Sequence, residues 1–461
     1  MDLLNDSPRG IEQMLLDTGF SDLDKDVPPR RRRSKNCCSS CCMWTVLAIA
    51  IVTMAYGLTE TTLYFLTREH DEPPTTTASS PTTTTLKNSG TCEKRIIGYF
   101  RLGESSELTE KQISLLTHII FYKFNIQENG TLTIGKPEEK EELAGLVKTA
   151  KWLNVKTMFS IDEEKSGSNL FSSVTADTKK RRTLVDSISF VIKEYHMDGV
   201  DIFWKWPSNE QEYSKLILLC TELRERFGQL AQATNRKTPF LISLILSPWP
   251  KHDTYRRIQD KITTLVDFLN VETNNYYGSW FSEAGHFIGP PAALYSGHEY
   301  HGGENVDYAM WYHSCRTGNP NKLNIGLSFR VNYWENVILP QNKSDTLWLK
   351  AEKINGTVRG GWLSWRNFEK KGWNLPSASW NQESRTPYFW EPDERRYIAF
   401  ENERSIQEKT NYAIDKNIGG FTIWALNDDD DDYSLSKAVG SANLCSGKGD
   451  NSIVNYNCTG V

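Results

Sequence analysis

The segment that decides the fold begins with GVDIFW at Gly199, continues through a helix-periodic stretch, Tyr213–Leu230, and ends with a second apolar run, FLISLIL, at Phe240. Both apolar runs are rich in β-branched and aromatic residues and nearly continuous, so we expect each strand to be covered on both faces. A strand, a helix and a second strand of this kind predict a parallel β-α-β unit.

The same alternation continues through most of the chain. Six further apolar runs carry it: RIIGYF from Arg95, HIIFYKF from His118, VKTMFSI from Val155, DFLNVET from Asp267, LNIGLSF from Leu323 and GFTIWAL from Gly420. Further helix candidates lie at 140–154, 183–196, 306–318 and 405–417. Eight strands that alternate with helices predict an α/β fold, a closed (β/α)8 or TIM barrel. An open doubly wound sheet is the alternative, although no glycine-rich dinucleotide loop follows the first strand.

The interval between the seventh and eighth strands is longer than the others. Its excess, about 333–392, predicts a small insertion module between strand seven and helix seven. Insertions that follow the strands of such a barrel build its ligand face.

An uncharged segment near the N-terminus predicts a transmembrane helix. No charged residue occurs between Lys35 and Glu60, and the apolar centre, Met43–Leu58, is long enough for one bilayer crossing. We assign 43–66 as an uncleaved signal anchor, with cleavage near Ala55 as the alternative. Four consecutive arginines precede the span, which places the N-terminus in the cytoplasm. The expected topology is single-pass type II, with the C-terminal domain extracellular or lumenal.

The regions on either side of the span complete the domain division. We predict a cytoplasmic tail at 1–42, a Ser/Thr/Pro-rich stalk at 67–91, a barrel at 92–444 and a C-terminal tail at 445–461. A stalk of this composition buries no core and holds the barrel away from the bilayer. Four Asn-X-Ser/Thr sequons are candidate glycosylation sites: Asn129, Asn342, Asn355 and Asn457.

The nine cysteines fall into two groups. Four lie at the cytoplasmic end of the span and are candidates for S-acylation, with a zinc site or unmodified thiols as alternatives: Cys37, Cys38, Cys41 and Cys42. Five follow the stalk: Cys92, Cys220, Cys315, Cys445 and Cys458. Among these we expect Cys445 and Cys458 to close the C-terminal tail.

The composition is that of a globular protein with no electrostatic preference for nucleic acid. The 461 residues are 38% hydrophobic and carry a formal net charge of −5. No metal or cofactor is predicted. We interpret His298–His301 as a loop segment rather than a metal pair, and Asp428–Asp432 as a solvated loop rather than a calcium site.

The stretch DGVDIFWKWP, Asp198–Pro207, resembles glycoside hydrolase family 18, the chitinases and chitinase-like lectins. The resemblance extends to THIIFYKF, NVETNNYYGSW, KLNIGLSF and GGFTIWAL, and covers most of Cys92–Leu444. It implies a barrel that binds or cleaves chitin.

The chain departs from the family pattern, DxxDxDxE, at its two reacting positions. Asp198 and Asp201 match the first two acids, whereas Phe203 replaces the third aspartate and Lys205 replaces the catalytic glutamate. In the family, that glutamate protonates the glycosidic oxygen while the aspartate orients the acetamido group of the substrate. A phenyl ring accepts no such hydrogen bond, and a lysine ammonium is a poor proton donor at neutral pH.

Three other family segments are also altered. The Tyr-Gly-Arg type segment that usually follows strand seven reads Arg330–Asn332. MxYD on strand six reads Glu272–Asn275, with Asn274 and Asn275 at its tyrosine and aspartate, and SxGG on strand three reads Ser160–Glu163. We expect the protein to be catalytically inactive. We also expect Lys205 to form a salt bridge with Asp162 or Glu163, because an unpaired buried ammonium is unstable.

The resemblance implies that sugar-binding residues remain. We expect Trp424, Asp201 and Trp280 to contact chitin or a chitooligosaccharide, with Trp424 as the floor of a sugar subsite. The aromatic residues of the insertion module are interpreted either as further sugar-stacking walls or as its own core. The alternatives to a glycan-binding protein are a pseudoenzyme scaffold that binds a protein and, more remotely, an active chitinase that hydrolyses β-1,4-N-acetylglucosaminyl bonds.

Overall fold

The computed structural model describes residues 93–162, 169–207, 209–249, 260–281, 284–297, 303–340, 347–370, 374–446 and 453–459. The expectations for the cytoplasmic tail with its four cysteines, the span, the stalk, Asn342 and His298–His301 lie outside these residues. Within the described part of the chain, every helix is too short or too polar to cross a membrane.

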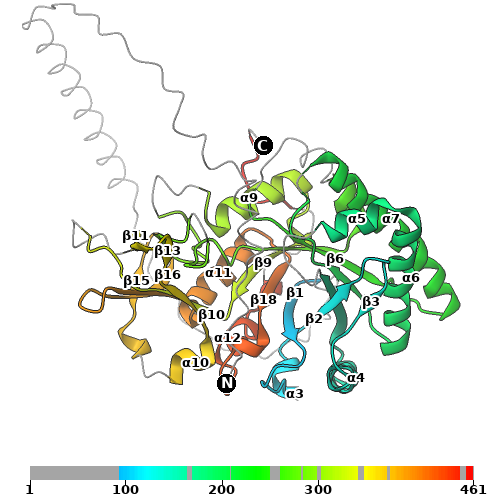
Figure 1. Ribbon diagram of the computed structural model, residues 1–461, viewed down its shortest axis with the longest axis horizontal. Helices are drawn as coiled ribbons and strands as arrows, with labels where there is room; N and C mark the ends of the chain where they lie inside the picture. The colour runs from blue at the N-terminus through cyan, green and yellow to red at the C-terminus, as the bar shows by residue number, and fades with distance from the viewer. Residues whose placement is uncertain are drawn as a thin grey trace, which may run out of the picture. The chain divides into compact units, whose positions relative to one another are not determined.

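Eight parallel strands form a closed barrel (Figure 1), as the sequence predicts. In chain order these are β1 (Arg95–Arg101), β2 (His118–Ile126), β4 (Lys156–Asp162), β5 (Gly199–Ile202), β6 (Leu241–Leu246), β7 (Phe268–Val271), β9 (Leu323–Ser328) and β18 (Gly420–Trp424). The sheet closes because β1 pairs with both β18 and β2. A short antiparallel strand, β3 (Leu132–Thr133), extends β2.

The predicted helices are present within a few residues of their expected bounds. They are α4 (Pro137–Trp152), α6 (Thr178–Tyr195), α7 (Glu210–Ala233), α9 (Val306–Thr317) and α11 (Glu403–Asp415). In four of these helices the side chain of the N-terminal capping residue accepts backbone hydrogen bonds. The capping residues are Asp177, Asn209, Asn305 and Asn402. Figure 1 shows α6 and α7 on the outer side of the strands. The largest hydrophobic cluster joins strand and helix side chains.

A buried polar column runs through the barrel interior. Arg95 Nε donates to Asn324 Oδ1 at 3.1 Å, and Asn324 Nδ2 donates to Asn270 Oδ1 at 2.9 Å. Asn270 Nδ2 then donates to the Tyr99 hydroxyl at 3.3 Å, which donates to Asp201 Oδ2 at 2.8 Å. These bonds satisfy polar groups from four strands that would otherwise be buried without partners.

The insertion module is larger than the predicted 333–392. Its five-stranded antiparallel sheet has the order β14 (Gly360–Ser364), β10 (Arg330–Trp334), β17 (Arg396–Ala399), β16 (Thr386–Glu391) and β15 (Ser379–Asn381). The module therefore extends from 330 to 399, because β10 follows β9 after one residue and pairs with β14 on one side and β17 on the other.

The predicted disulfide between Cys445 and Cys458 is wrong. Cys458 bonds to Cys315. Cys445 is also in a disulfide, and Cys220 is a buried free thiol. Two contacts lay the tail across α9 and α11: Trp311 Nε1 donates to the Asn457 carbonyl at 2.9 Å, and the hydroxyls of Tyr412 and Tyr456 lie 2.7 Å apart. This path brings Cys458 to the end of α9.

Removing the bond with the paired change Cys315→Ser and Cys458→Ser should lower the free energy of unfolding by about 2 kcal/mol. The bridge closes a sequence separation of 143 residues, but the hydrogen bonds of the tail remain, so the expected loss is at the low end of the usual range. Urea denaturation of the full-length chain measures the change. An unchanged midpoint and slope would show that these contacts hold the tail without the disulfide.

Candidate functional site

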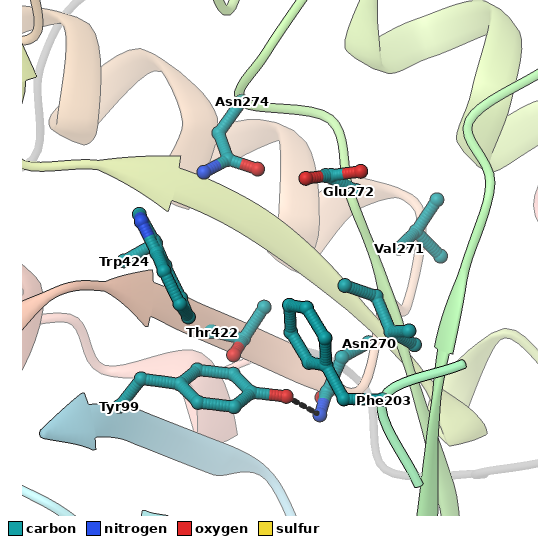
Figure 2. Close-up of a pocket in the computed structure, with 9 residues that line it drawn as sticks. Tyr99, Phe203, Asn270, Val271, Glu272, Asn274, Thr422 and Trp424 are labelled. Atoms are coloured by element: carbon teal, nitrogen blue, oxygen red, sulfur yellow. Dashed lines mark hydrogen bonds between the residues drawn. The ribbon is translucent and has the colours of Figure 1, made fainter. Parts of the chain in front are cut away.

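A pocket opens at the C-terminal ends of the barrel strands, where the barrel fold builds its ligand sites (Figure 2). Its lining comes from five strands and the residues that follow them: Tyr99, Phe203, Ile245, Asn270, Val271, Glu272, Asn274, Thr422 and Trp424. The volume open to water is about 20 Å³, roughly the room for one water molecule. In this conformation the pocket therefore has no room for a sugar ring.

Phe203 fills the position beside Trp424. The two ring centroids lie 5.7 Å apart with an interplanar angle of 27°, which is a stacked arrangement. Tyr99 and Tyr122 pack edge-on against Phe203, with centroids at 5.9 and 5.3 Å. The Trp424 ring, which the resemblance assigns to a sugar subsite, is thus in contact with another side chain of the same protein (Figure 2).

Lys205 forms an ion pair with Glu272, which follows β7. The expected salt bridge of Lys205 is confirmed, with Glu272 as the partner in place of Asp162. Glu163 lies outside the described residues, and Asp162 Oδ2 accepts a hydrogen bond from the Tyr122 hydroxyl at 2.5 Å. The Lys205 ammonium also lies over the Phe203 ring, 4.9 Å from its centroid. The cation therefore contacts a carboxylate and an aromatic face together.

Asp201 lies fully buried beneath the pocket. Its carboxylate accepts hydrogen bonds from the hydroxyls of Tyr99 at 2.8 Å, Ser160 at 3.0 Å and Ser243 at 2.6 Å. Burial raises the pKa of Asp201, and the three hydroxyl donors act in the opposite direction. Since no surface of Asp201 reaches solvent, the observed contacts give it a role in the barrel interior.

The other predicted site residues are spread over several places. Asp198 precedes β5 and accepts hydrogen bonds from the Thr157 amide at 2.9 Å and from Arg236 at 2.7 Å. Asn274 lines the pocket, whereas Asn275 and Trp280 are not among its lining residues. Trp280 lies against Phe281, with ring centroids 5.6 Å apart. Among the predicted ligand contacts, Trp424 alone lines the pocket.

The acidic loop after β18 is more buried than predicted. Asp428, Asp429 and Asp430 are buried, while Asp431 and Asp432 are exposed, so a fully solvated loop is the wrong interpretation. Burial raises the pKa of Asp429 to about 6. No group of three or more metal-ligating side chains occurs within the described ranges.

An arginine pair holds the loop to the mouth of the barrel. Asp428 accepts from Arg101 at 2.9 Å and from Arg330 Nε at 3.1 Å, and Asp430 accepts from Trp365 Nε1 at 3.0 Å. The buried carboxylates thus connect the barrel to the insertion module.

Sequence reasoning missed two tyrosines of the site and the contact that Arg330 makes with Trp424. Tyr99 and Tyr122 surround Phe203 and Trp424, and Arg330 lies over Trp424 with its guanidinium carbon 5.9 Å from the ring centroid. Strand alternation could have placed Tyr99 in the site. Residues two apart on a strand face the same side, and Ile97 and Tyr99 both belong to the buried cluster that contains Phe203. No pattern in a single chain indicates that Arg330 reaches Trp424.

The family model described as glycosyl hydrolases family 18 matches residues 95–429. The chain is 23% identical to Chitinase A1 of Niallia circulans, over 65% of this chain and 47% of that relative. It is 22% identical to Chitinase 1 of Aphanocladium album, over 70% of this chain and 78% of the relative. The chain thus spans about half the length of Chitinase A1 and 78% of the length of Chitinase 1.

Solved structures share the fold. A class V chitinase mutant from Nicotiana tobaccum, in complex with NAG4, matches with a TM-score of 0.64 and 18% identity, covering 76% of this chain and 98% of that one. YKL-39, solved in the presence of chitooligosaccharides, matches with a TM-score of 0.63 and 20% identity, covering 76% of this chain and 99% of that one. At this identity the likeness establishes the barrel fold.

Proposed function

Because the chain belongs to glycosyl hydrolases family 18, we propose that it is a catalytically inactive chitinase-like protein that binds chitin or other N-acetylglucosamine-containing glycans. One observation carries the proposal of inactivity. Lys205, at the position that the resemblance assigns to the proton donor, is held in an ion pair by Glu272. A lysine that is paired with a carboxylate does not replace a carboxylic acid as the proton donor to a glycosidic oxygen.

Phe203 also supports inactivity, because it replaces the residue that would hold the substrate's acetamido group, the internal nucleophile of the family mechanism. The family mechanism needs a carboxylate that holds the acetamido group of the substrate, and the phenyl ring of Phe203 offers no acceptor. The ring also stacks on Trp424, where the reacting sugar would lie. Both the acid and the acetamido partner are therefore replaced by groups that contact other side chains of this protein.

The glycan class is inferred from the family. One solved relative is in complex with NAG4 and another was solved in the presence of chitooligosaccharides. The barrel of this chain retains Trp424 at its mouth, and the flat face of an indole packs well against the apolar face of a pyranose.

A pseudoenzyme scaffold that binds a protein is the second candidate, and the size of the pocket favours it. The volume open to water is about 20 Å³, so a sugar enters only if side chains move. Chitohexaose is the probe that separates the two functions, because a scaffold of this kind does not bind it.

The test of inactivity is the turnover of a chitotrioside by the full-length chain. We expect no turnover above the buffer blank. The change Phe203→Asp with Lys205→Glu should remain inactive, because the new carboxylate at 205 faces Glu272 and Asn274 still replaces the family tyrosine. Turnover by the unmodified chain that disappears in Trp424→Ala would identify an active chitinase and end the proposal.

We also propose that the barrel is displayed outside the cytoplasm by a single-pass type II anchor at 43–66. The exposed positions of Asn129, Asn355 and Asn457 support this topology, because a glycosylated asparagine must be accessible. A shift in mobility after peptide N-glycosidase treatment, lost when all four sequons are removed, is the expected result. The proposed topology would be contradicted if the treatment caused no shift and if protease added to intact cells did not cleave the chain.

A further inference from the structure

A second pocket lies at the opposite end of the barrel from the mouth. Its volume open to water is about 260 Å³, whereas that of the pocket at the mouth is about 20 Å³. One wall comes from the last turns of α7 and the other from 236–240, the segment that leads into β6. Because the helices of this fold run back along the strands, this segment lies at the N-terminal ends of the strands.

A glycine inside α7 keeps the pocket open. Arg224, Phe227, Gly228 and Ala231 line it, and their spacing of three and four residues places them on one face of the helix. A Cβ atom at Gly228 would have no neighbour from the rest of the fold within 4 Å. Glycine is unfavourable inside a helix, so a larger residue here would stabilise α7 but would fill the pocket.

Two phenylalanines supply the apolar part of the lining. Phe227 and Phe240 are both buried, and their ring centroids lie 5.5 Å apart. The guanidinium carbon of Arg236 lies 4.4 Å from the centroid of the Phe240 ring. An apolar lining with a few polar groups beside it is typical of small-molecule sites.

Hydrogen bonds hold both walls in place. Arg224 Nη1 donates to the Phe240 carbonyl at 2.8 Å, and its Nη2 donates to Asp267 Oδ2 at 2.5 Å. Arg236 Nη2 donates to Asp198 Oδ1 at 2.7 Å. Since these side chains are already fixed, a ligand needs to order little of the protein when it binds.

The charges of the lining favour an anion. Three lining residues are cations, Arg224, Arg236 and Lys237, and none of the lining residues is acidic. Asp267 pairs with Arg224, and Asp198 pairs with Arg236. Lys237 is exposed and forms no ion pair with another residue that the structure describes. One positive charge at the edge of the pocket therefore remains for a ligand.

We infer that this pocket binds a small organic carboxylate with an apolar body. The carboxylate would contact Lys237, and the body would lie against Phe227 and Phe240. The volume is just below the range of roughly 300–1,000 Å³ that is usual for ligand pockets, which favours a small ligand. The inference does not depend on the proposed function, because Phe203 and Trp424 lie at the other end of the barrel.

The test is a titration of the full-length chain with 4-phenylbutyrate, followed by saturation-transfer NMR of the ligand. We expect saturable binding with a Kd on the order of 1 mM, an affinity that about twelve ligand atoms support at modest efficiency. Two related compounds separate the contributions of charge and ring. 4-Phenylbutanol lacks the charge and butyrate lacks the ring, and each should bind at least about fivefold more weakly.

Variants of the chain locate the bound ligand. Gly228→Leu should weaken the binding of 4-phenylbutyrate at least about tenfold, because the new side chain occupies the pocket. Gly145→Leu is the matched control, since Gly145 is also an exposed helix glycine, in α4, with no neighbour within 4 Å. It should leave the affinity unchanged. Lys237→Glu changes an exposed side chain that the fold does not need, and it should weaken binding about tenfold.

Three outcomes would overturn the inference. Binding of 4-phenylbutyrate that Gly228→Leu and Lys237→Glu both leave within twofold of the unmodified chain would place the ligand elsewhere. The absence of a saturable signal from the folded chain at about ten times the expected Kd would exclude the site. Equal affinities for 4-phenylbutyrate and 4-phenylbutanol would exclude the anionic ligand class.

Discussion

Replacing Phe203 with alanine should tighten chitohexaose binding to the full-length chain and make that binding depend on Trp424. The change removes the ring that stacks on Trp424 at a centroid distance of 5.7 Å, so an indole face becomes available inside the pocket. We expect an affinity gain of about tenfold, equivalent to about 1.4 kcal/mol, which is within the range of one aromatic contact. Calorimetry and tryptophan fluorescence both report the change.

The same change should lower the free energy of unfolding by about 3 kcal/mol. Phe203 is buried, but the space it leaves opens toward the pocket, so water fills part of it and the loss stays near the low end for such a truncation. Phe171→Ala is the matched control, because Phe171 also stacks on a tryptophan, Trp204, at 5.1 Å, outside the pocket lining. It should destabilise the chain without a gain in affinity.

The double variant Phe203→Ala with Trp424→Ala decides the cause of the gain. If stacking on Trp424 produces it, the double variant returns to the affinity of the unmodified chain. A folded Phe203→Ala variant that binds chitohexaose no better than the unmodified chain would contradict the view that Phe203 occupies a sugar position.

Replacing Lys409 with methionine should lower the free energy of unfolding by about 3–5 kcal/mol. The side chains of Lys409 and Glu401 are 0% and 2% exposed, and Lys409 Nζ lies 2.7 Å from Glu401 Oε1. Removing the cation leaves a buried carboxylate whose remaining hydrogen-bond donor among the described residues is the Ser405 hydroxyl, at 2.5 Å. An uncompensated buried charge is far less stable than a buried pair.

A second variant tests this cause. Lys409→Met combined with Glu401→Gln removes both charges and should recover more than half of the loss, measured by urea denaturation. Lys416→Met, which breaks an ion pair with the largely exposed Asp415, should have little effect on stability and controls for the loss of a lysine from the same region. Equal losses in the single and double variants at 409 and 401 would show that packing, not charge, is responsible.

The barrel could be predicted because burial on both strand faces leaves a local pattern. GVDIFW and FLISLIL became β5 and β6, and the helix between them begins after the capping residue Asn209, which precedes its first turn. Such features depend on residues close together in the chain. The eight-strand count and the position of the insertion followed from the same local signals.

Partners in space were less predictable. By sequence alone, several cysteines were candidate disulfide partners of Cys458. The path of the tail over α9 places Cys458 beside Cys315, and these two form the bond. For Lys205 the sequence suggested the acidic residues Asp162 and Glu163 of strand three, and the structure pairs it with Glu272. In both cases the choice depends on how elements far apart in sequence pack, and hydrophobic periodicity carries no information on that.

The sequence by itself determined the barrel and the residue types at the reacting positions, including Phe203 and Lys205, because strand burial is local and identity needs no coordinates. Tertiary structure alone decided that Phe203 stacks on Trp424 and that Trp362 is exposed while Trp334 is buried. Exposure and stacking depend on the neighbours that other strands supply. The pairing of β10 with β14 brings together residues that are 26 to 34 positions apart, and the order of residues in the chain does not show which face each one occupies.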